Sequence, residues 1–200
     1  MREHFFNFLK LIFAFSLIPL TAIVTISFTK SLTGLTQAEG HFFWMGILIY
    51  VIVHIFIAEP PRIYQFGQRL TASLLGFYPP LANVGSRIFP IYTLLNLISF
   101  YFIYLFYNKS EYGIYFMFLA GFTLALHIVL TAKELREEGK SAFSPNYLLF
   151  IQFIYIFIIF LILVIFTLII PKFSFSSFFY STVESIKNSY TAIFHQLFVP

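Results

Sequence analysis

Uninterrupted apolar runs recur along the whole 200-residue chain and limit what it can fold into. Because an α-helix rises about 1.5 Å per residue, roughly twenty apolar residues cross the ~30 Å hydrocarbon core of a bilayer. The composition has the same bias, with 60% hydrophobic residues, 10% charged residues and 30 phenylalanines. An ordinary soluble domain does not have this composition. We therefore expect an all-α, polytopic integral membrane protein.

The apolar runs predict about five transmembrane helices within a membrane domain that covers residues 1–170. The expected spans are residues 8–29, 41–58, 88–107, 112–132 and 147–170. Short polar segments separate the spans, and we expect additional amphipathic helices at the membrane surface.

The distribution of basic residues predicts the orientation of these spans. With the N-terminus inside, eight basic residues lie in the cytoplasm: Arg2, Lys10, Arg62, Arg69, Arg87, Lys133, Arg136 and Lys140. Four basic residues lie outside: Lys30, Lys109, Lys172 and Lys187. Because cytoplasmic loops are enriched in Lys and Arg, this asymmetry favours a cytoplasmic N-terminus and an outside C-terminus.

Several classes of chemistry are excluded or unsupported by the residues present. The chain has no cysteine, which excludes disulfides, thiolate metal sites and a cysteine nucleophile. The net charge is +4, but the basic residues are scattered at membrane edges, so we expect no nucleic-acid partner. In the segment KELREEGK, Glu134, Glu137 and Glu138 alternate with basic residues at helical spacing, which is typical of a solvated helix end with local ion pairs.

The stretch IYQFGQRLTASLLGF predicts an amphipathic helix at about residues 62–77. One face is apolar, with Ile63, Phe66, Leu70, Leu74 and Phe77. The opposite face is polar, with Arg62, Gln65, Arg69 and Ser73. The simplest interpretation is a helix in the cytoplasmic headgroup layer whose arginines lie near lipid phosphates.

The same stretch also suggests a family. The order of FFWMGILIYVIVHIFIAEPPRIYQFGQRLTASLLGF, RIFPIYTLLNLISF and GFTLALHIVLTAKELRE, over roughly residues 42–175, resembles bacterial membrane zinc metalloproteases of the site-2-protease type. In that family a membrane helix carries Phe-Gly-His-Glu-Leu-Thr-His, with two histidines that bind zinc and a glutamate that activates water. The matching residues are Phe66, Gly67, Leu70 and Thr71.

The positions that would hold the zinc are substituted. Gln68 and Ala72 replace the two histidines, and Arg69 replaces the glutamate. Alanine has no donor atom, and a guanidinium that stays protonated cannot act as a general base. The third ligand in such enzymes is usually an aspartate, but this chain has none, which leaves His127 as the nearest stand-in. The resemblance therefore implies a catalytically inactive member without a metal site.

A second interpretation rests on two histidines at membrane depth. His54 and His127 each follow a glycine by fourteen residues, in spans that run in the same direction, so we expect them at similar depth. Two such histidines could ligate haem or a metal, with Glu59 as a proton partner. Asn96, in the third predicted span, is a further polar residue at membrane depth. Interhelical hydrogen bonding is the more common role of helical histidines. We therefore expect no cofactor.

Residues 171–200 are predicted to form an amphipathic tail on the outer face. Its apolar residues recur at steps of three and four: Phe179, Val183, Ile186, Tyr190, Ile193 and Leu197. We expect this stripe either to lie on the outer leaflet or to dock onto a partner protein.

These observations predict a non-catalytic, pseudoprotease-like protein of the bacterial cytoplasmic membrane, which acts as a binding or scaffolding subunit of a larger membrane assembly. The lipid bilayer and other membrane protein subunits are its expected partners. The first alternative is a small redox or metal-binding module that uses His54 and His127. The second alternative is an active membrane enzyme or transporter whose site the sequence does not reveal.

Overall fold

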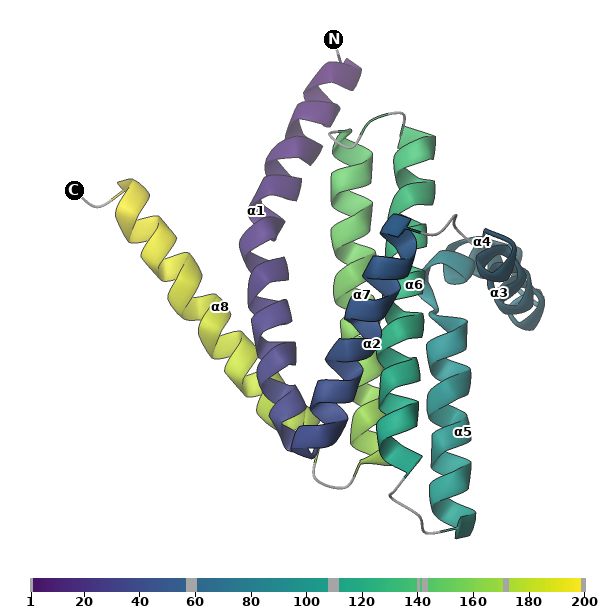
Figure 1. The fold of residues 1–200 in the computed structure, drawn as a ribbon. Helices are drawn as coiled ribbons and strands as arrows, with labels where there is room; N and C mark the ends of the chain where they lie inside the picture. Colours follow the sequence, from purple (N-terminus) through teal and green to yellow (C-terminus); the bar gives the residue numbers. More distant parts are fainter. Residues whose placement is uncertain are drawn as a thin grey trace. The chain divides into compact units, whose positions relative to one another are not determined.

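The computed structural model describes residues 2–56, 61–107, 112–139, 141, 144–170 and 173–198. Regular structure in these ranges is entirely helical, which confirms the predicted all-α class. The helices are α1 (Arg2–Ser31), the short 3-10 helix η1 (Leu32–Gly34), α2 (Gln37–Phe56), α3 (Pro61–Leu74), α4 (Pro79–Ile88), α5 (Ile91–Tyr107), α6 (Gly113–Gly139), α7 (Pro145–Ile169) and α8 (Phe175–Phe198) (Figure 1).

Among the described residues, four helices are long and apolar enough to cross a membrane. They cover Phe5–Gly34, Gln37–Phe56, Gly113–Gly139 and Pro145–Leu168. The fifth predicted span, residues 88–107, corresponds to α5, which has 17 residues and is shorter than these four. Large apolar side chains lie on the surface of these helices, among them Phe56, which is 80% exposed. Such a surface is suited to lipid contact.

The chain divides into two compact units, Met1–Gly34 with Gly139–Pro200, and Leu35–Glu138. In the second unit, α2 and α6 run parallel and their backbones touch (Figure 1). A Cβ atom added to Gly46 would overlap the carbonyl oxygen of Phe118, and one added to Gly121 would overlap that of Phe43. Glycine is required at both positions because any side chain would separate the two helices.

Helix α5 runs antiparallel to α6 and is joined to it by polar contacts. The hydroxyls of Thr93 and Thr123 are 3.0 Å apart, and the Asn96 amide nitrogen donates to the carbonyl oxygen of Phe116 at 2.8 Å. Asn96, which the sequence marks as a polar residue within a predicted span, thus forms an interhelical hydrogen bond. Such bonds satisfy polar groups that would be costly in lipid.

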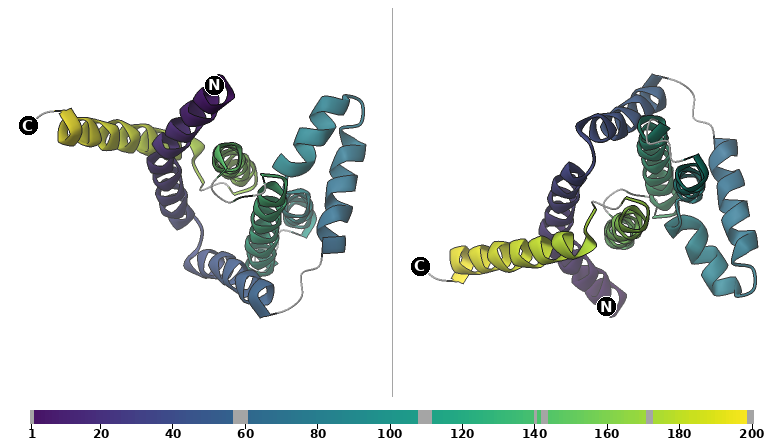
Figure 2. Two further views of the ribbon diagram at one scale, coloured as in Figure 1. Left: turned by 90° about the horizontal axis from the view of Figure 1, so that it is seen from above. Right: turned by 90° about the horizontal axis from the view of Figure 1, so that it is seen from below.

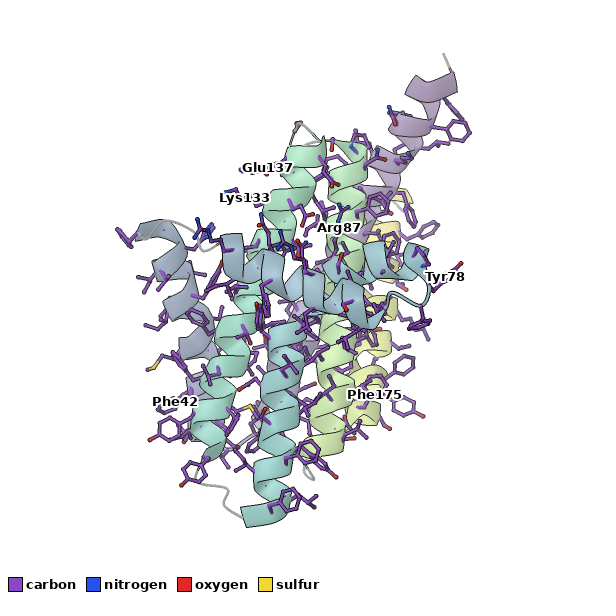
Figure 3. The ribbon with its side chains drawn as sticks, turned by 90° about the vertical axis from the view of Figure 1, so that its right-hand side faces the viewer. Phe42, Tyr78, Arg87, Lys133, Glu137 and Phe175 are labelled. Carbon is purple, nitrogen blue, oxygen red and sulfur yellow. The ribbon has the colours of Figure 1, made fainter. Side chains whose placement is uncertain are left out.

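Helices α3 and α4 lie crosswise at the end of α5 (Figures 2 and 3). The Tyr92 hydroxyl of α5 donates to the carbonyl oxygen of Ile63, and the Tyr92 ring packs on Gly67. The helix predicted at residues 62–77 ends at Leu74. No element was predicted at residues 78–87, where α4 begins with Pro79 and Pro80. Two prolines fit the first turn of a helix, whose N–H groups have no intrahelical acceptor.

In the first unit, α1 and α7 run parallel. Lys10 donates to the side-chain oxygen of Asn146 at 2.9 Å. Deeper along the pair, Thr21 donates to Gln152 at 3.2 Å, and the hydroxyls of Thr25 and Tyr155 are 2.9 Å apart. The pair is therefore joined by hydrogen bonds at several levels along its length.

Helix α8 packs antiparallel on α1. Phe178 and Thr182, near its beginning, are buried, and farther along the Tyr190 hydroxyl donates to the carbonyl oxygen of Ser16 at 2.6 Å. The predicted amphipathic tail is thus a helix of 24 residues with a partner in its own chain. Its position relative to a membrane stays a prediction.

Candidate functional site

A stripe of polar residues follows one face of α6, which we name the α6 polar stripe. It consists of His127, Thr131, Glu134 and Glu138. The spacing of four, three and four residues places them on one side of a helix. His127 is 5% exposed and Thr131 is fully buried, because this side of α6 faces α3 and α4. Buried polar groups need hydrogen-bond partners, and these two helices supply them.

Helix α3 contributes Tyr64 and Gln68. The Tyr64 hydroxyl is 2.8 Å from that of Thr131 and donates to Glu134 at 3.2 Å, while the Gln68 amide donates to the same carboxylate oxygen at 2.6 Å. Burial raises the pKa of the Tyr64 phenol above its ordinary value; the hydrogen bond with Thr131 partly opposes this, and the charge of Glu134 adds to it. Tyr64 therefore stays a neutral donor to Glu134.

Helix α4 contributes Arg87 through both its side chain and its main chain. Its guanidinium forms a two-pronged ion pair with Glu138, in which Nη1 donates at 3.0 Å, and Nη2 lies 3.5 Å from Glu134. Its carbonyl oxygen lies 2.9 Å from Nε2 of His127. Figure 3 shows Arg87 near the end of α6 that carries Lys133 and Glu137. The last turn of α4 is thus fixed to α6 at two points.

The acidic residues of α6 have a partner that the sequence did not predict. The sequence predicted ion pairs within the helix end, whereas the ion pairs of Glu134 and Glu138 described here are with Arg87, which is distant in sequence. Because both carboxylates and the guanidinium are partly exposed, each ion pair contributes little to stability on its own. The bidentate pair of Arg87 with Glu138 serves mainly to position α4.

The surface of α3 is divided among three faces. Tyr64, Gly67 and Thr71 are buried against the protein. The apolar face predicted from the sequence, which includes Phe66 and Leu74, is exposed. Arg62, Gln65 and Arg69 are also exposed, on the opposite side of the helix. An apolar face that the protein does not cover fits the predicted position of this helix at a membrane surface.

The structure separates the three substituted zinc-motif positions. Gln68 faces Glu134, whereas Arg69 is exposed and Ala72 is half-buried. The described part of the chain holds no group of three or more His, Cys, Asp or Glu residues that could bind a metal ion. The donors nearest the motif are joined to one another rather than arranged around an open position.

The two histidines of the alternative interpretation lie in different surroundings. His54 is half-buried, and its ring stacks on Tyr50 with the centroids 5.9 Å apart. The ring of His127 lies 6.0 Å from that of Tyr64 and forms the interhelical contact with Arg87. Glu59, their predicted proton partner, lies outside the described residues.

A groove of about 380 Å³ lies between α1 and α7 in the first unit. Its lining is mostly aliphatic and includes Ala14, Ile18 and Ile151. Its polar side chains are those of Thr21, Thr25 and Gln152. Thr21 donates to Gln152, and the Thr25 hydroxyl contacts that of Tyr155. The groove therefore offers a mainly apolar surface.

Sequence reasoning did not identify Tyr64, Arg87, Glu134 or Glu138 as members of one cluster. The sequence did contain one signal of this cluster. Polar residues recur at helical spacing along α6, from the predicted span into the polar end of the helix. The pairing with Arg87 depends on α4, a helix that was not predicted from the sequence.

Searches against protein-family models, curated proteins and solved structures found no match for this chain. The class is therefore defined by the described residues alone. They are all-helical where structure is regular, include four helices long and apolar enough to cross a membrane, and form a polar cluster that holds two short amphipathic helices at one end of α6.

Proposed function

We propose that this chain is a non-catalytic, multi-pass membrane protein, related to membrane metalloproteases of the site-2-protease type, that serves as a binding or scaffolding subunit of a larger membrane assembly. The observation that carries the proposal is the hydrogen bond from Gln68 to Glu134. Gln68, which stands at a zinc-ligand position of the motif, attaches α3 to α6.

The donor chemistry around this bond supports a structural role. One oxygen of Glu134 accepts from Gln68 and Tyr64, and the other faces Arg87. Nε2 of His127 contacts a backbone carbonyl. A catalytic zinc site needs three donors directed at one point with a fourth position open to water, whereas these groups are directed at each other.

The arrangement of α3 and α4 supports a binding role. The cluster holds both helices at the end of α6, while the apolar face of α3 and the side chain of Val84 on α4 stay exposed. A fixed amphipathic platform of this kind is suited to contact with lipid and with neighbouring membrane proteins.

We further propose that the protein lies in the bacterial cytoplasmic membrane with its N-terminus in the cytoplasm. α5 is the fifth span, and the loop that follows α6 is cytoplasmic. This orientation rests on the excess of basic residues on the cytoplasmic side. It also places Arg62, Arg69 and Arg87 together at the cytoplasmic surface.

The test is to purify the chain from its native membrane in mild detergent and to measure its mass and metal content together. We expect a complex in which another membrane protein is present in a fixed ratio, without stoichiometric zinc. A zinc-loaded protein that cleaves peptides in the membrane would overturn the proposal. A Soret band lost in His54→Ala would also overturn it, in favour of a haem-binding module.

A further inference from the structure

The groove between α1 and α7 has the width of a single hydrocarbon chain. Its lining on α1 runs from Ala14 to Thr25, which is about 16 Å along the helix. Divided by this length, the volume of about 380 Å³ gives a mean cross-section of about 24 Å². A partner helix, about 10 Å wide with its side chains, has a cross-section roughly three times as large. The groove is therefore too narrow for a helix but suits one unbranched chain.

The side chains that line the groove suit an apolar occupant. Ile18 is 50% exposed there. The Gln152 side chain is fully paired within the protein, since its amide nitrogen donates to the carbonyl oxygens of Ala14 and Leu148. Its oxygen accepts from Thr21 at 3.2 Å. An occupant without hydrogen-bonding groups therefore leaves no polar group of Gln152 without a partner.

One end of the groove is positively charged. Lys10 lies one helical turn before Ala14 and is exposed, and its ammonium donates to the uncharged Asn146 amide at 2.9 Å. An ammonium has three donors, so this contact leaves donors and the full charge for a ligand. The contact also places Lys10 beside the first turn of α7, whose N-terminus adds partial positive charge. This end of the groove suits an anion.

We propose that the groove binds an anionic phospholipid, with one acyl chain between α1 and α7 and the headgroup phosphate at Lys10. This inference rests on the membrane position in the proposed function and adds a specific lipid ligand to it. The groove is about as long as half of the ~30 Å hydrocarbon core, which is the depth that an acyl chain of one leaflet covers. A lysine near the end of a span reaches the headgroup layer with its flexible side chain.

The headgroup distinguishes this site from nonspecific lipid contact. A zwitterionic phospholipid carries its own ammonium, which weakens the attraction between its phosphate and Lys10. An anionic headgroup keeps its full attraction. Two lipids with identical acyl chains, phosphatidylglycerol and phosphatidylethanolamine, therefore separate the effect of charge from that of the groove.

Lipid retention by the purified chain in detergent, counted by native mass spectrometry, tests the charged end. From an equal mixture of these two lipids we expect one phosphatidylglycerol per chain to be retained in preference. Lys10→Gln should weaken phosphatidylglycerol binding roughly fivefold, the effect of one lysine on an anionic lipid. Lys30→Gln is the matched control, because it removes the same charge from the last turn of α1, and it should leave retention unchanged.

A second variant tests the groove itself. Ala22→Phe places a ring among the lining residues and leaves Lys10 intact, so we expect at least a tenfold loss of phosphatidylglycerol binding. Ile12→Phe adds a ring on an exposed part of α1 outside the lining and should have no effect. Because a ligand of the folded state raises the unfolding midpoint, added phosphatidylglycerol should stabilise the unmodified chain and Lys30→Gln more than Lys10→Gln.

Equal losses in Lys10→Gln and Lys30→Gln would overturn the proposal, because the lipid would then respond only to net charge. Unchanged retention by Ala22→Phe, or equal retention of the two lipids by the unmodified chain, would overturn it as well. A chain that stays in the membrane after carbonate extraction but retains no phosphatidylglycerol defeats this inference alone. A chain that carbonate releases defeats the membrane assignment on which it rests.

Discussion

At the scale of single residues, Glu134 connects both short helices to α6. Its carboxylate accepts from Tyr64 and Gln68 of α3 and lies beside Arg87 of α4. The sequence marks Glu134 only as one of three acidic residues in a polar helix end. Its role depends on residues more than forty positions away, which no local pattern specifies.

We expect Glu134→Gln to destabilise the protein by about 1–2 kcal/mol, because the amide keeps the shape but loses the charge that strengthens these hydrogen bonds. This corresponds to a thermal unfolding midpoint lowered by roughly 2–8 °C in detergent. Glu137→Gln is the control, since Glu137 is an exposed neighbour on the same helix. Equal midpoints for the two variants would contradict a special role of Glu134.

Tyr64 should make the stability of the folded protein depend on pH in the alkaline range. Burial raises the pKa of its phenol in the folded protein, so in the unfolded chain the phenol loses its proton at lower pH. The unfolded state therefore gains stability as pH rises above about 10, and the folded protein becomes less stable. We expect the unfolding midpoint between pH 9 and 11 to fall less steeply in Tyr64→Phe. Parallel curves would show that Tyr64 does not contribute this dependence.

At the scale of helices, the contact of α2 with α6 depends on two glycines. We expect Gly46→Ala and Gly121→Ala each to destabilise the protein by roughly 1–3 kcal/mol, because the new methyl group meets backbone that cannot move aside cheaply. Thermal unfolding measures the loss. Leu119→Ala on the exposed side of α6 is the control, and an equal loss there would indicate that close helix contact is not the cause.

Helix α3 allows a direct test of the substituted motif. Gln68→His together with Ala72→His places two imidazoles one turn apart, near the carboxylate of Glu134. We expect this variant to gain zinc affinity, measured by calorimetry and metal analysis. Gln65→His together with Arg69→His is the matched control, with the same spacing on an exposed face. Stoichiometric zinc in the unmodified protein would contradict the proposed loss of the metal site.

The sequence predicted the helices more completely than it predicted the contacts between them. Long apolar runs predict the spanning helices because lipid exposure and burial both favour apolar residues. Because lipid-facing and buried sides are both apolar, the sequence does not show which side of a helix packs on protein. The buried side of α3, with Tyr64 and Thr71, was therefore not predicted. No element was predicted for residues 78–87, so α4 was missed, although a proline pair such as Pro79 and Pro80 can begin a helix.

At the scale of the whole molecule, the orientation can be tested with reporter fusions. A reporter inserted within residues 134–142 is expected in the cytoplasm because of the basic residues there. For a reporter after Pro200 the sequence predicts the outside. Finding both reporters on the same side of the membrane would contradict the predicted five-span orientation.

The double attachment of Arg87 restricts how this sequence can change over time. Glu134 and Glu138 are one helical turn apart, and Arg87 contacts both. Replacing Arg87 alone would leave two like charges adjacent on α6, while replacing either carboxylate alone would weaken the anchor of α4. Related sequences should therefore alter these positions in concert, so that their joint variation would mark the α4–α6 attachment even where the apolar spans have diverged beyond alignment.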